Sequence, residues 1–445
     1  MDHLTYARAQ MGFSLAFHML FAAVGVALPL FMVIADVLYR RTGDRDWLEF
    51  SKRMAKGTAI LFAVGAVSGT ALSFELGLLW PRFMGTFGDI IGLPFAMEGF
   101  AFFTEAIFLG IYLYGRGKIP SGIHLAAGIG VALSGAVSAF FVTLVNATMN
   151  LPRGFEMLNG HPINIDPLAA MFSVPWKHET LHALLACYQA TAFALAGIHA
   201  AVLLRHPKSS LFRKAFAVSL AVASVTALLQ PLSGDHSAHA IAESEPLKLA
   251  AAEAHFRTQT HAPLHLGGIP DLETGEVHYG LSIPSGLSIL ATHDPAAEVK
   301  GLFDFPREDW PPVARTHYAF DVMVGAGSAM ALLGLVAGFL AWRKKGVPDA
   351  RWFLWAVVAS GPLGFIALEA GWLVTELGRQ PWIMHGVMRT RDAVTPFPHL
   401  LPPFWTFTGL YLFLGVTVVY LLFRQLRTAP MEASPPSVRG SDAHH

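Results

Sequence analysis

The chain has 445 residues, of which 53% are hydrophobic and only 14% are charged. A soluble domain carries about 25% charged residues, so this composition excludes an ordinary soluble protein and indicates an integral membrane protein. The formal net charge is zero, which leaves no basic surface for nucleic acid, and the single cysteine excludes an intrachain disulfide framework and a multi-cysteine metal or iron–sulfur site.

Hydrophobic segments long enough to cross a bilayer recur along the chain. A spanning helix needs about 20 mostly apolar residues. No short signal peptide with a small-residue cleavage site is visible, so the first segment is expected to be kept as an anchor. The sequence therefore predicts an all-α integral membrane protein with nine helices, at residues 11–38, 54–78, 93–115, 123–146, 178–204, 212–233, 316–342, 352–376 and 400–424.

Lysine and arginine gather in every second connection between these helices. Residues 39–56 are rich in them, as are 116–118, 205–214 and 343–351, whereas the alternate connections are poor in them for their length. Because positively charged residues favour the cytoplasmic side, we expect the N-terminus outside and the C-terminus in the cytoplasm.

The same assignments divide the chain into four parts. Residues 1–233 hold the first six helices, and 234–315 form a long outer loop with turn clusters and many polar residues. Loops of this length are usually functional or disordered. Residues 316–427 hold the last three helices, and 428–445 are expected to be a disordered cytoplasmic tail.

Polar candidates within the predicted helices share one depth. A charged residue in hydrocarbon costs about 2.5–3.5 kcal/mol, so such residues are usually functional. The two pairs of carboxylates on the third and eighth helices are each spaced by seven residues, which places each pair on one helix face. Purely structural, helix-pairing carboxylates are the alternative. The candidates in the outer half of the membrane are His18, Glu98, Glu105, His178, His182, Met323, Glu369 and Glu376.

Two of these candidates suit a haem. His182 and Met323 lie at matching depth on different helices and could supply the two axial ligands of a low-spin haem. Taken alone, a methionine such as Met323 is more often an ordinary core residue, and His18 is as consistent with an interhelical hydrogen bond as with a metal ligand.

A competing motif is His178-Glu179-Thr180-Leu181-His182, which fits the H-E-x-x-H pattern of zinc proteases. Zinc needs a third protein ligand, and intramembrane zinc proteases take it from a Leu-Asp-Gly-like motif that does not occur here. An intramembrane zinc metalloprotease is thus one alternative. A haem-free proton-coupled transporter and a structural subunit without a cofactor are the others.

Four separated motifs resemble subunit I of the cytochrome bd-type terminal oxidases. They are FHMLF at 17–21, GDIIGLPFAMEG at 88–99, KLAAAEA at 248–254, and EAGW with ELGRQPW within 369–382. They occur in the order found in that family, on nine predicted helices, and the resemblance covers nearly the whole chain. The outer loop is of the shorter kind known in the family.

The resemblance implies three haems, namely a low-spin haem b, a high-spin haem b, and a haem d or a further haem b in its place. His182 and Met323 would ligate the low-spin haem, and His18 and Glu376 the two high-spin haems. Three more residues would bind these cofactors: Arg8, Trp372 and Arg379. The arginines would pair with haem propionates, for which a guanidinium fork is well suited.

The resemblance also implies sites for protons and quinol. Glu98 and Glu105 would line a proton route to the oxygen site, and Lys248 and Glu253 would contact the quinol. Quinol would be oxidised at the outer face and oxygen reduced to water with cytoplasmic protons, which builds a membrane potential without a pump. The expected partners are a subunit II, with room for a small single-helix subunit, in a bacterial cytoplasmic membrane.

Two residues depart from the pattern of the better-known members. Asp321, two residues before Met323, stands where those members carry Arg. Glu245 stands before Pro246 where Gln is usual. These departures leave open which quinol or other donor is used and what surrounds the low-spin haem.

Overall fold

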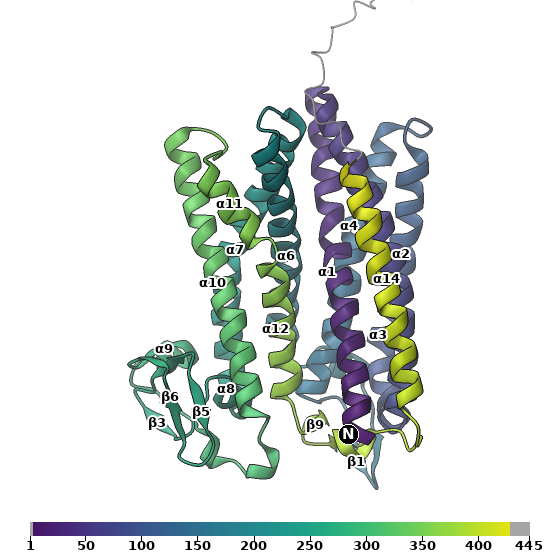
Figure 1. Cartoon of the computed structure of the whole chain (residues 1–445). Helices are drawn as coiled ribbons and strands as arrows, with labels where there is room; N and C mark the ends of the chain where they lie inside the picture. Colours follow the sequence, from purple (N-terminus) through teal and green to yellow (C-terminus); the bar gives the residue numbers. More distant parts are fainter. Residues whose placement is uncertain (1–2, 428–445) are drawn as a thin grey trace, which may run out of the picture.

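The computed structural model describes residues 3–427. Within that part of the chain, nine helical segments are long and apolar enough to cross a membrane, which confirms the predicted number. They form an upright bundle, and the N-terminus lies at the end of the bundle that also carries most of the strands (Figure 1). The predicted tail at 428–445 lies outside the described residues.

Most of the spanning helices are longer than the apolar segments from which they were predicted. Six spans precede the long loop: α1 (His3–Thr42), α2 (Arg45–Leu79), α3 (Pro81–Gly115), α4 (Ser121–Asn150), α6 (Trp176–Arg205) and α7 (Ser210–Ser244). The remaining spans are α10 (Val313–Lys344), the pair α11 (Arg351–Ser360) and α12 (Leu363–Gly378), and α14 (Leu401–Arg427). Short connecting elements are β1 (Glu156–Leu158), β2 (His161–Ile163), α5 (Pro167–Met171), β9 (Trp382–Met384), β10 (Met388–Arg389) and α13 (Thr390–Ala393).

The sixth predicted helix was too short. It was expected to end at residue 233, but α7 continues to Ser244, so the long loop begins at Glu245. The apolar stretch ends at the polar residues after 233, whereas the backbone stays helical as far as Ser244, two residues before Pro246. A residue that precedes proline is disfavoured in helical conformation, which explains the end of α7.

The eighth predicted helix is not continuous. It was expected at 352–376, but α11 ends at Ser360 and α12 begins at Leu363. The Gly361-Pro362 pair between them accounts for the break, because proline lacks the N–H donor and clashes with the preceding turn. The break lies against α6, where a Cβ added to Gly197 would meet the Cα of Gly361 at 3.3 Å.

The long loop, residues 245–312, folds as a compact unit beside α10. It begins with α8 (Pro246–Ala252) and carries three antiparallel strand pairs, β3·β8, β4·β7 and β5·β6. Its own apolar core, which includes Phe256 and Leu302, extends to Val313 at the start of α10. The loop elements are β3 (Gln259–Thr260), β4 (Leu264–Leu266), β5 (Ile269–Asp271), β6 (Glu276–His278), β7 (Leu281–Ile283), α9 (Gly286–Thr292), β8 (Glu298–Val299), η1 (Leu302–Asp304) and η2 (Arg307–Asp309).

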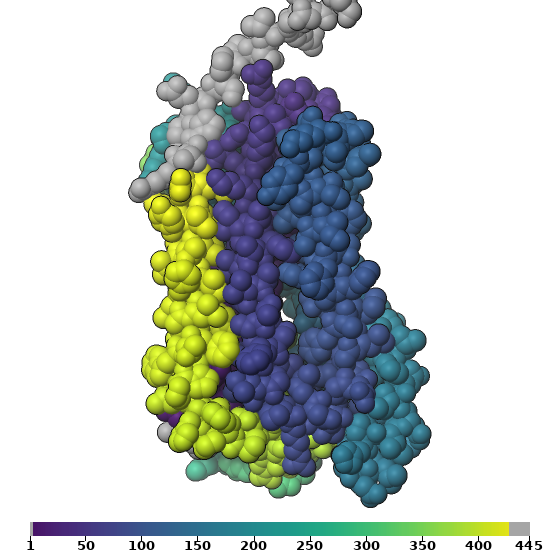
Figure 2. Space-filling model, turned by 90° about the vertical axis from the view of Figure 1, so that its right-hand side faces the viewer, coloured from purple at the N-terminus to yellow at the C-terminus, as the bar shows by residue number. Residues whose placement is uncertain are grey.

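Five phenylalanines from five different helices mark the centre of the bundle. Each is at most 2% exposed, and all belong to one apolar cluster: Phe31, Phe50, Phe193, Phe216 and Phe353. The outer faces are apolar as well. Figure 2 shows the face on which α14 lies beside the neighbouring helices, and α3 and α14 expose large apolar side chains such as Phe100, Phe103 and Phe413. Apolar faces of this extent suit a lipid bilayer or a partner subunit.

Candidate functional site

An ion pair lies at the end of α12, in which the Arg379 side chain is buried and the Glu376 side chain is 26% exposed. The Arg379 Nη2 atom is 2.5 Å from the Glu376 Oε2 atom, and Asn146 on α4 donates a hydrogen bond of 3.0 Å to Glu376 Oε1. Arg379 is 3% exposed, yet its Nε and Nη1 have no hydrogen-bond partner within residues 3–427. Leaving buried polar groups unpaired is costly, so these two donors are suited to an acceptor that the chain itself does not supply.

A chain of hydrogen bonds leads from this pair to Glu179. The Asn150 amide nitrogen donates to Asn146 Oδ1 at 2.8 Å and to Glu179 Oε1 at 2.7 Å. Asn146 and Asn150 are both buried on α4. The sequence analysis missed these two amides. The signal available for them was the presence of two amides four residues apart at the end of an apolar helix, which places them on one face.

His182 and Met323 lie on helices that pack in the same part of the bundle. The His182 Nδ1 is 2.9 Å from Ser233 Oγ, and its Nε2 is 3.1 Å from the amide nitrogen of Gln230, both on α7. The Met323 thioether lies against α12, where a Cβ added to Gly371 would approach its sulfur to 2.9 Å. A glycine at position 371 therefore leaves the space that the thioether occupies.

Two further buried polar atoms lie on α12 without a partner in the described part of the chain, Trp372 Nε1 and Glu369 Oε1. The Trp372 indole N–H and the guanidinium of Arg379, which directly follows α12, can donate hydrogen bonds, whereas the Glu369 carboxylate oxygen can accept one. An imidazole, a thioether, a carboxylate and unpaired donors fit the needs of haem iron and haem propionates. The residues present are therefore compatible with the haem groups that the sequence predicts.

His18 on α1 and two glutamates of α3, Glu98 and Glu105, face neighbouring helices. The His18 Nδ1 is 2.9 Å from Ser68 Oγ on α2. Ser138 on α4 donates a hydrogen bond of 2.9 Å to Glu98 Oε1, and Glu105 is 5% exposed and lies over Gly135 of α4. Arg8 is exposed near the start of α1. The structure thus turns Glu98 and Glu105 toward α4, as their spacing by seven predicts, and records no contact of either with Glu376.

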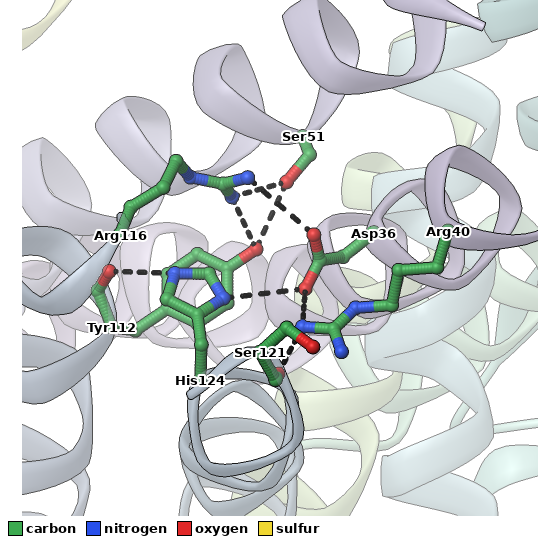
Figure 3. Close-up of polar contacts among 7 residues, drawn as sticks. All are labelled: Asp36, Arg40, Ser51, Tyr112, Arg116, Ser121 and His124. Atoms are coloured by element: carbon green, nitrogen blue, oxygen red, sulfur yellow. Dashed lines mark hydrogen bonds and ion pairs between the residues drawn. The ribbon is translucent and has the colours of Figure 1, made fainter. Parts of the chain in front are cut away.

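A separate polar cluster joins α1 to α4 at the opposite end of the bundle (Figure 3). Its centre is Asp36, which is 2% exposed and lies 3.2 Å from Arg40, 3.4 Å from Arg116 and 3.3 Å from His124. The Tyr112 hydroxyl is 2.9 Å from Ser51 Oγ and accepts a hydrogen bond of 2.9 Å from Arg116. The sequence analysis used Arg116 only as a topology marker and did not predict this cluster.

In the long loop, Lys248 and Glu245 form a buried ion pair. Glu245 is the residue at which glutamine was expected, and its carboxylate provides a partner for the buried ammonium. Glu253, at the end of α8, is 1% exposed, and neither of its carboxylate oxygens has a hydrogen-bond partner among the described residues. Burial, and to a lesser degree the charge of Asp321, raises the pKa of Glu253 to about 8.

Asp321 faces His317 and the long loop. Its Oδ2 is 3.2 Å from His317 Nε2, and its Oδ1 accepts a hydrogen bond of 3.3 Å from the backbone N–H of Gly267. The acidic residue at this position is therefore tied to the loop and to an imidazole, and no ion pair joins it to Arg379 in the described structure.

Residues 3–427 contain no group of three or more His, Cys, Asp or Glu side chains arranged to hold a metal ion. In the H-E-x-x-H motif, Glu179 bonds to Asn150 and His182 lies against Ser233. Within the described residues, the third protein ligand that a zinc protease requires is therefore not found beside this motif.

Comparison with known proteins gives a consistent result. The family model for cytochrome bd terminal oxidase subunit I matches residues 6–430. A Bacillus subtilis protein named provisionally as a cytochrome bd menaquinol oxidase subunit I is 36% identical, over 97% of this chain and 98% of its own length. A second B. subtilis protein, cytochrome bd ubiquinol oxidase subunit 1, is 31% identical over 96% of this chain and 94% of its own length.

A solved structure agrees with these matches. The bd oxidase of Geobacillus thermodenitrificans has a chain that superposes with a TM-score of 0.91 at 41% identity, covering 96% of this chain and 99% of that one. The chain therefore belongs to the cytochrome bd terminal oxidase subunit I family, and it is a haem-binding oxidoreductase subunit that crosses the membrane several times and works with a subunit II.

Proposed function

We propose that this chain is the haem-carrying subunit of a quinol oxidase that reduces oxygen to water. The observation that carries the proposal is the partly buried Glu376–Arg379 pair at the end of α12, in which two nitrogens of the buried guanidinium have no hydrogen-bond partner among the described residues. The motif resemblance and the family match support the same activity.

The ligand assignment follows the motifs. His182 and Met323 would hold a low-spin haem b, and His18 and Glu376 would hold a high-spin haem b and a haem d or a further haem b. Arg379, Arg8 and Trp372 would bind the haem edges. The haems supply the electron transfer and the oxygen chemistry when bound, and the protein supplies ligation, orientation and a dry surrounding.

Protons would reach the oxygen site along the face shared by α3 and α4. Glu105 and Glu98 lie two turns apart on α3, and both turn toward small residues of α4, Gly135 and Ser138. A carboxylate can hold a proton and release it toward the next acceptor. With protons drawn from the cytoplasm and quinol oxidised outside, each turnover would build a membrane potential without a pump.

The quinol site would lie where the long loop meets α10 and α12. Lys248 packs over Gly378, where an added Cβ would meet its Cγ at 2.7 Å. Glu253 would accept a quinol proton, and the Glu245–Lys248 pair would orient a quinol oxygen. The two B. subtilis relatives carry menaquinol and ubiquinol in their names, so both donors are candidates.

The charge distribution supports an arrangement with the N-terminus and the long loop outside and the C-terminus in the cytoplasm of a bacterium. Subunit II would cover one of the apolar faces, and a small single-helix subunit is a further candidate partner.

The proposal is tested with the complex of this chain and its subunit II. Oxygen consumption with menaquinol and with ubiquinol should exceed that of a Glu376→Gln complex by at least about 100-fold, because loss of an iron ligand removes the oxygen site. Equal rates for both complexes, or no oxygen consumption with either quinol, would contradict the proposal.

A further inference from the structure

A group of buried polar atoms without partners gathers under the long loop. Both carboxylate oxygens of Glu253 and the His265 Nδ1 have no hydrogen-bond partner among the described residues, and His317 Nε2 has among them only its ion-pair contact with Asp321. Glu253 is 1% exposed and His317 is fully buried. Unpaired buried polar atoms are rare in folded proteins, so this concentration of them indicates a site that exchanges protons or binds a polar ligand.

The hydrogen bonds of His317 define which of its nitrogens can accept a proton. His317 Nδ1 lies 2.8 Å from the backbone carbonyl of Ala252. A carbonyl oxygen only accepts, so Nδ1 carries the hydrogen and donates it. Nε2 is therefore the nitrogen at which the ring would take up a second proton. It points to Asp321 Oδ2 at 3.2 Å, and that carboxylate would balance the charge of a protonated imidazole.

His265 lies between this group of polar atoms and an open pocket of the long loop. It lies on β4, near enough to His317 for the imidazolium charge of His317 to contribute to lowering the pKa of His265, although burial is the larger cause. His265 also lines an open pocket of about 330 Å³, together with Ala254 and His255, the two residues that follow Glu253. The pocket is thus lined by the residues that adjoin Glu253 in the chain.

The charged and titratable groups that face this site come from several elements. Asp321 lies on α10 with His317, Glu253 and His255 follow α8, His265 lies on β4, and the Glu245–Lys248 pair stands at the start of α8. Burial is the main cause that lowers the pKa of His255, with His265 as a further cause. A neutral histidine with one free nitrogen is suited to accept and release a proton near neutral pH.

We infer that Glu253, His317 and His265 form a proton exit that carries quinol protons to the open pocket of the long loop. This inference rests on the proposed quinol oxidase function. As the quinol gives its electrons to the oxidase, in which oxygen is the final acceptor, a quinol O–H bond breaks and its proton bonds to an oxygen of the ionised Glu253 carboxylate. The Glu253 O–H bond then breaks and the proton bonds to His317 Nε2, beside the charge of Asp321. His265 takes it next and releases it to water in the pocket.

His317→Asn tests this route in the assembled oxidase. The asparagine amide can keep the donor to the Ala252 carbonyl, but it offers no basic nitrogen in place of Nε2. We expect quinol-driven oxygen consumption to fall about 10- to 100-fold in kcat, within the range that proton transfer contributes to catalysis, with KM changed less than about twofold. The haem absorption spectrum should stay unchanged.

A donor that carries no proton separates this role from a structural one. Tetramethyl-p-phenylenediamine gives up one electron without releasing a proton, so His317→Asn should oxidise it at the wild-type rate. The matched control is His278→Asn, which changes an exposed histidine of the same loop and should leave both rates unchanged. If His317→Asn alters the haem spectrum, His265→Asn replaces it with the same expected pattern.

The outcomes separate the two proposals. Wild-type quinol rates in the histidine variants, or equal losses with both donors and an intact haem spectrum, would overturn the proton exit alone. A wild-type complex that oxidises no quinol would overturn the quinol oxidase function, and the proton exit with it.

Discussion

The buried Arg379 guanidinium combines a contact within the fold with two nitrogens that could bind a ligand. One of its nitrogens holds Glu376, while the other two have no partner in the described chain. The motif that contains both residues could be found from sequence, because a charge at the end of an apolar segment stands out. The spacing of Asn146 and Asn150 places them on one helix face, but the bond of Asn146 to Glu376 could not be predicted, since it depends on how α4 is rotated against α12.

Glu253 should give quinol oxidation a dependence on pH. A carboxylate must be ionised to accept a proton, and the pKa of Glu253 is raised to about 8, so the rate should increase as the pH rises toward 8 and level off above it. Glu253→Gln should remove that rise and slow quinol oxidation about 100-fold. The measurement is kcat between pH 6 and 9. Glu273→Gln, an exposed loop position, is the control, and a rise that persists in Glu253→Gln would disprove the assignment.

The proposed low-spin haem site makes a prediction at one ligand. His182→Ala should remove the low-spin component from the absorption spectrum and leave the high-spin components, because only one haem would lose an axial ligand. His206→Ala, an exposed histidine after α6, should leave the spectrum as in the wild type. An unchanged spectrum in His182→Ala would refute the ligand assignment.

At the scale of helices, hydropathy located every span but not the irregularities between and within them. The helical extension of α7 past residue 233 carries polar residues, and so it could not be separated from a loop by an apolar window. The break between α11 and α12 follows from Gly361-Pro362, a pair visible in the sequence but compatible with a kinked continuous helix. In the structure the helix is interrupted at this pair, and the chain around the break packs closely against α6.

That packing can be tested with glycines. A Cβ at Gly364 would lie 2.4 Å from the Cα of Ala190, so Gly364→Ala must push α12 away from α6. We expect it to destabilise the complex by about 1–3 kcal/mol, as overpacking usually does. Gly338→Ala on α10, where an added Cβ meets nothing within 4 Å, should be neutral or stabilising. Thermal unfolding of the purified complex measures both, and equal melting temperatures would contradict the close approach.

The polar cluster around Asp36 joins α1, α2, α3 and α4 at the end of the bundle opposite to Glu376. Asp36→Ala would leave Arg40, Arg116 and His124 without their carboxylate, and removing one partner of a buried pair costs about 3–5 kcal/mol. The two arginines are each 25% exposed, so the lower end of that range is expected. Asp349→Ala, which breaks only exposed ion pairs, should cost at most about 1 kcal/mol. Similar melting temperatures for the two variants would show that the cluster is not stabilising.

At the scale of the whole molecule, the fold class, the number of spans and the family could be predicted from sequence. Long apolar segments and the four ordered motifs are patterns of residues close together in the sequence, so they can be recognised without a structure. The bond of His317 to the Ala252 carbonyl and the unpaired oxygens of Glu253 were not predictable, since they require the long loop to fold onto α10. The His317–Asp321 contact, by contrast, joins residues four apart on one helix and is a local signal.

The central claim is that this chain holds haem iron through His182, Met323, His18 and Glu376. The reduced-minus-oxidised absorption spectrum of the purified complex with subunit II tests it most directly. We expect haem b bands, with a further band in the far red if haem d is present, and loss of a high-spin component in Glu376→Ala. A spectrum without haem bands, or one that Glu376→Ala leaves unchanged, would contradict the claim.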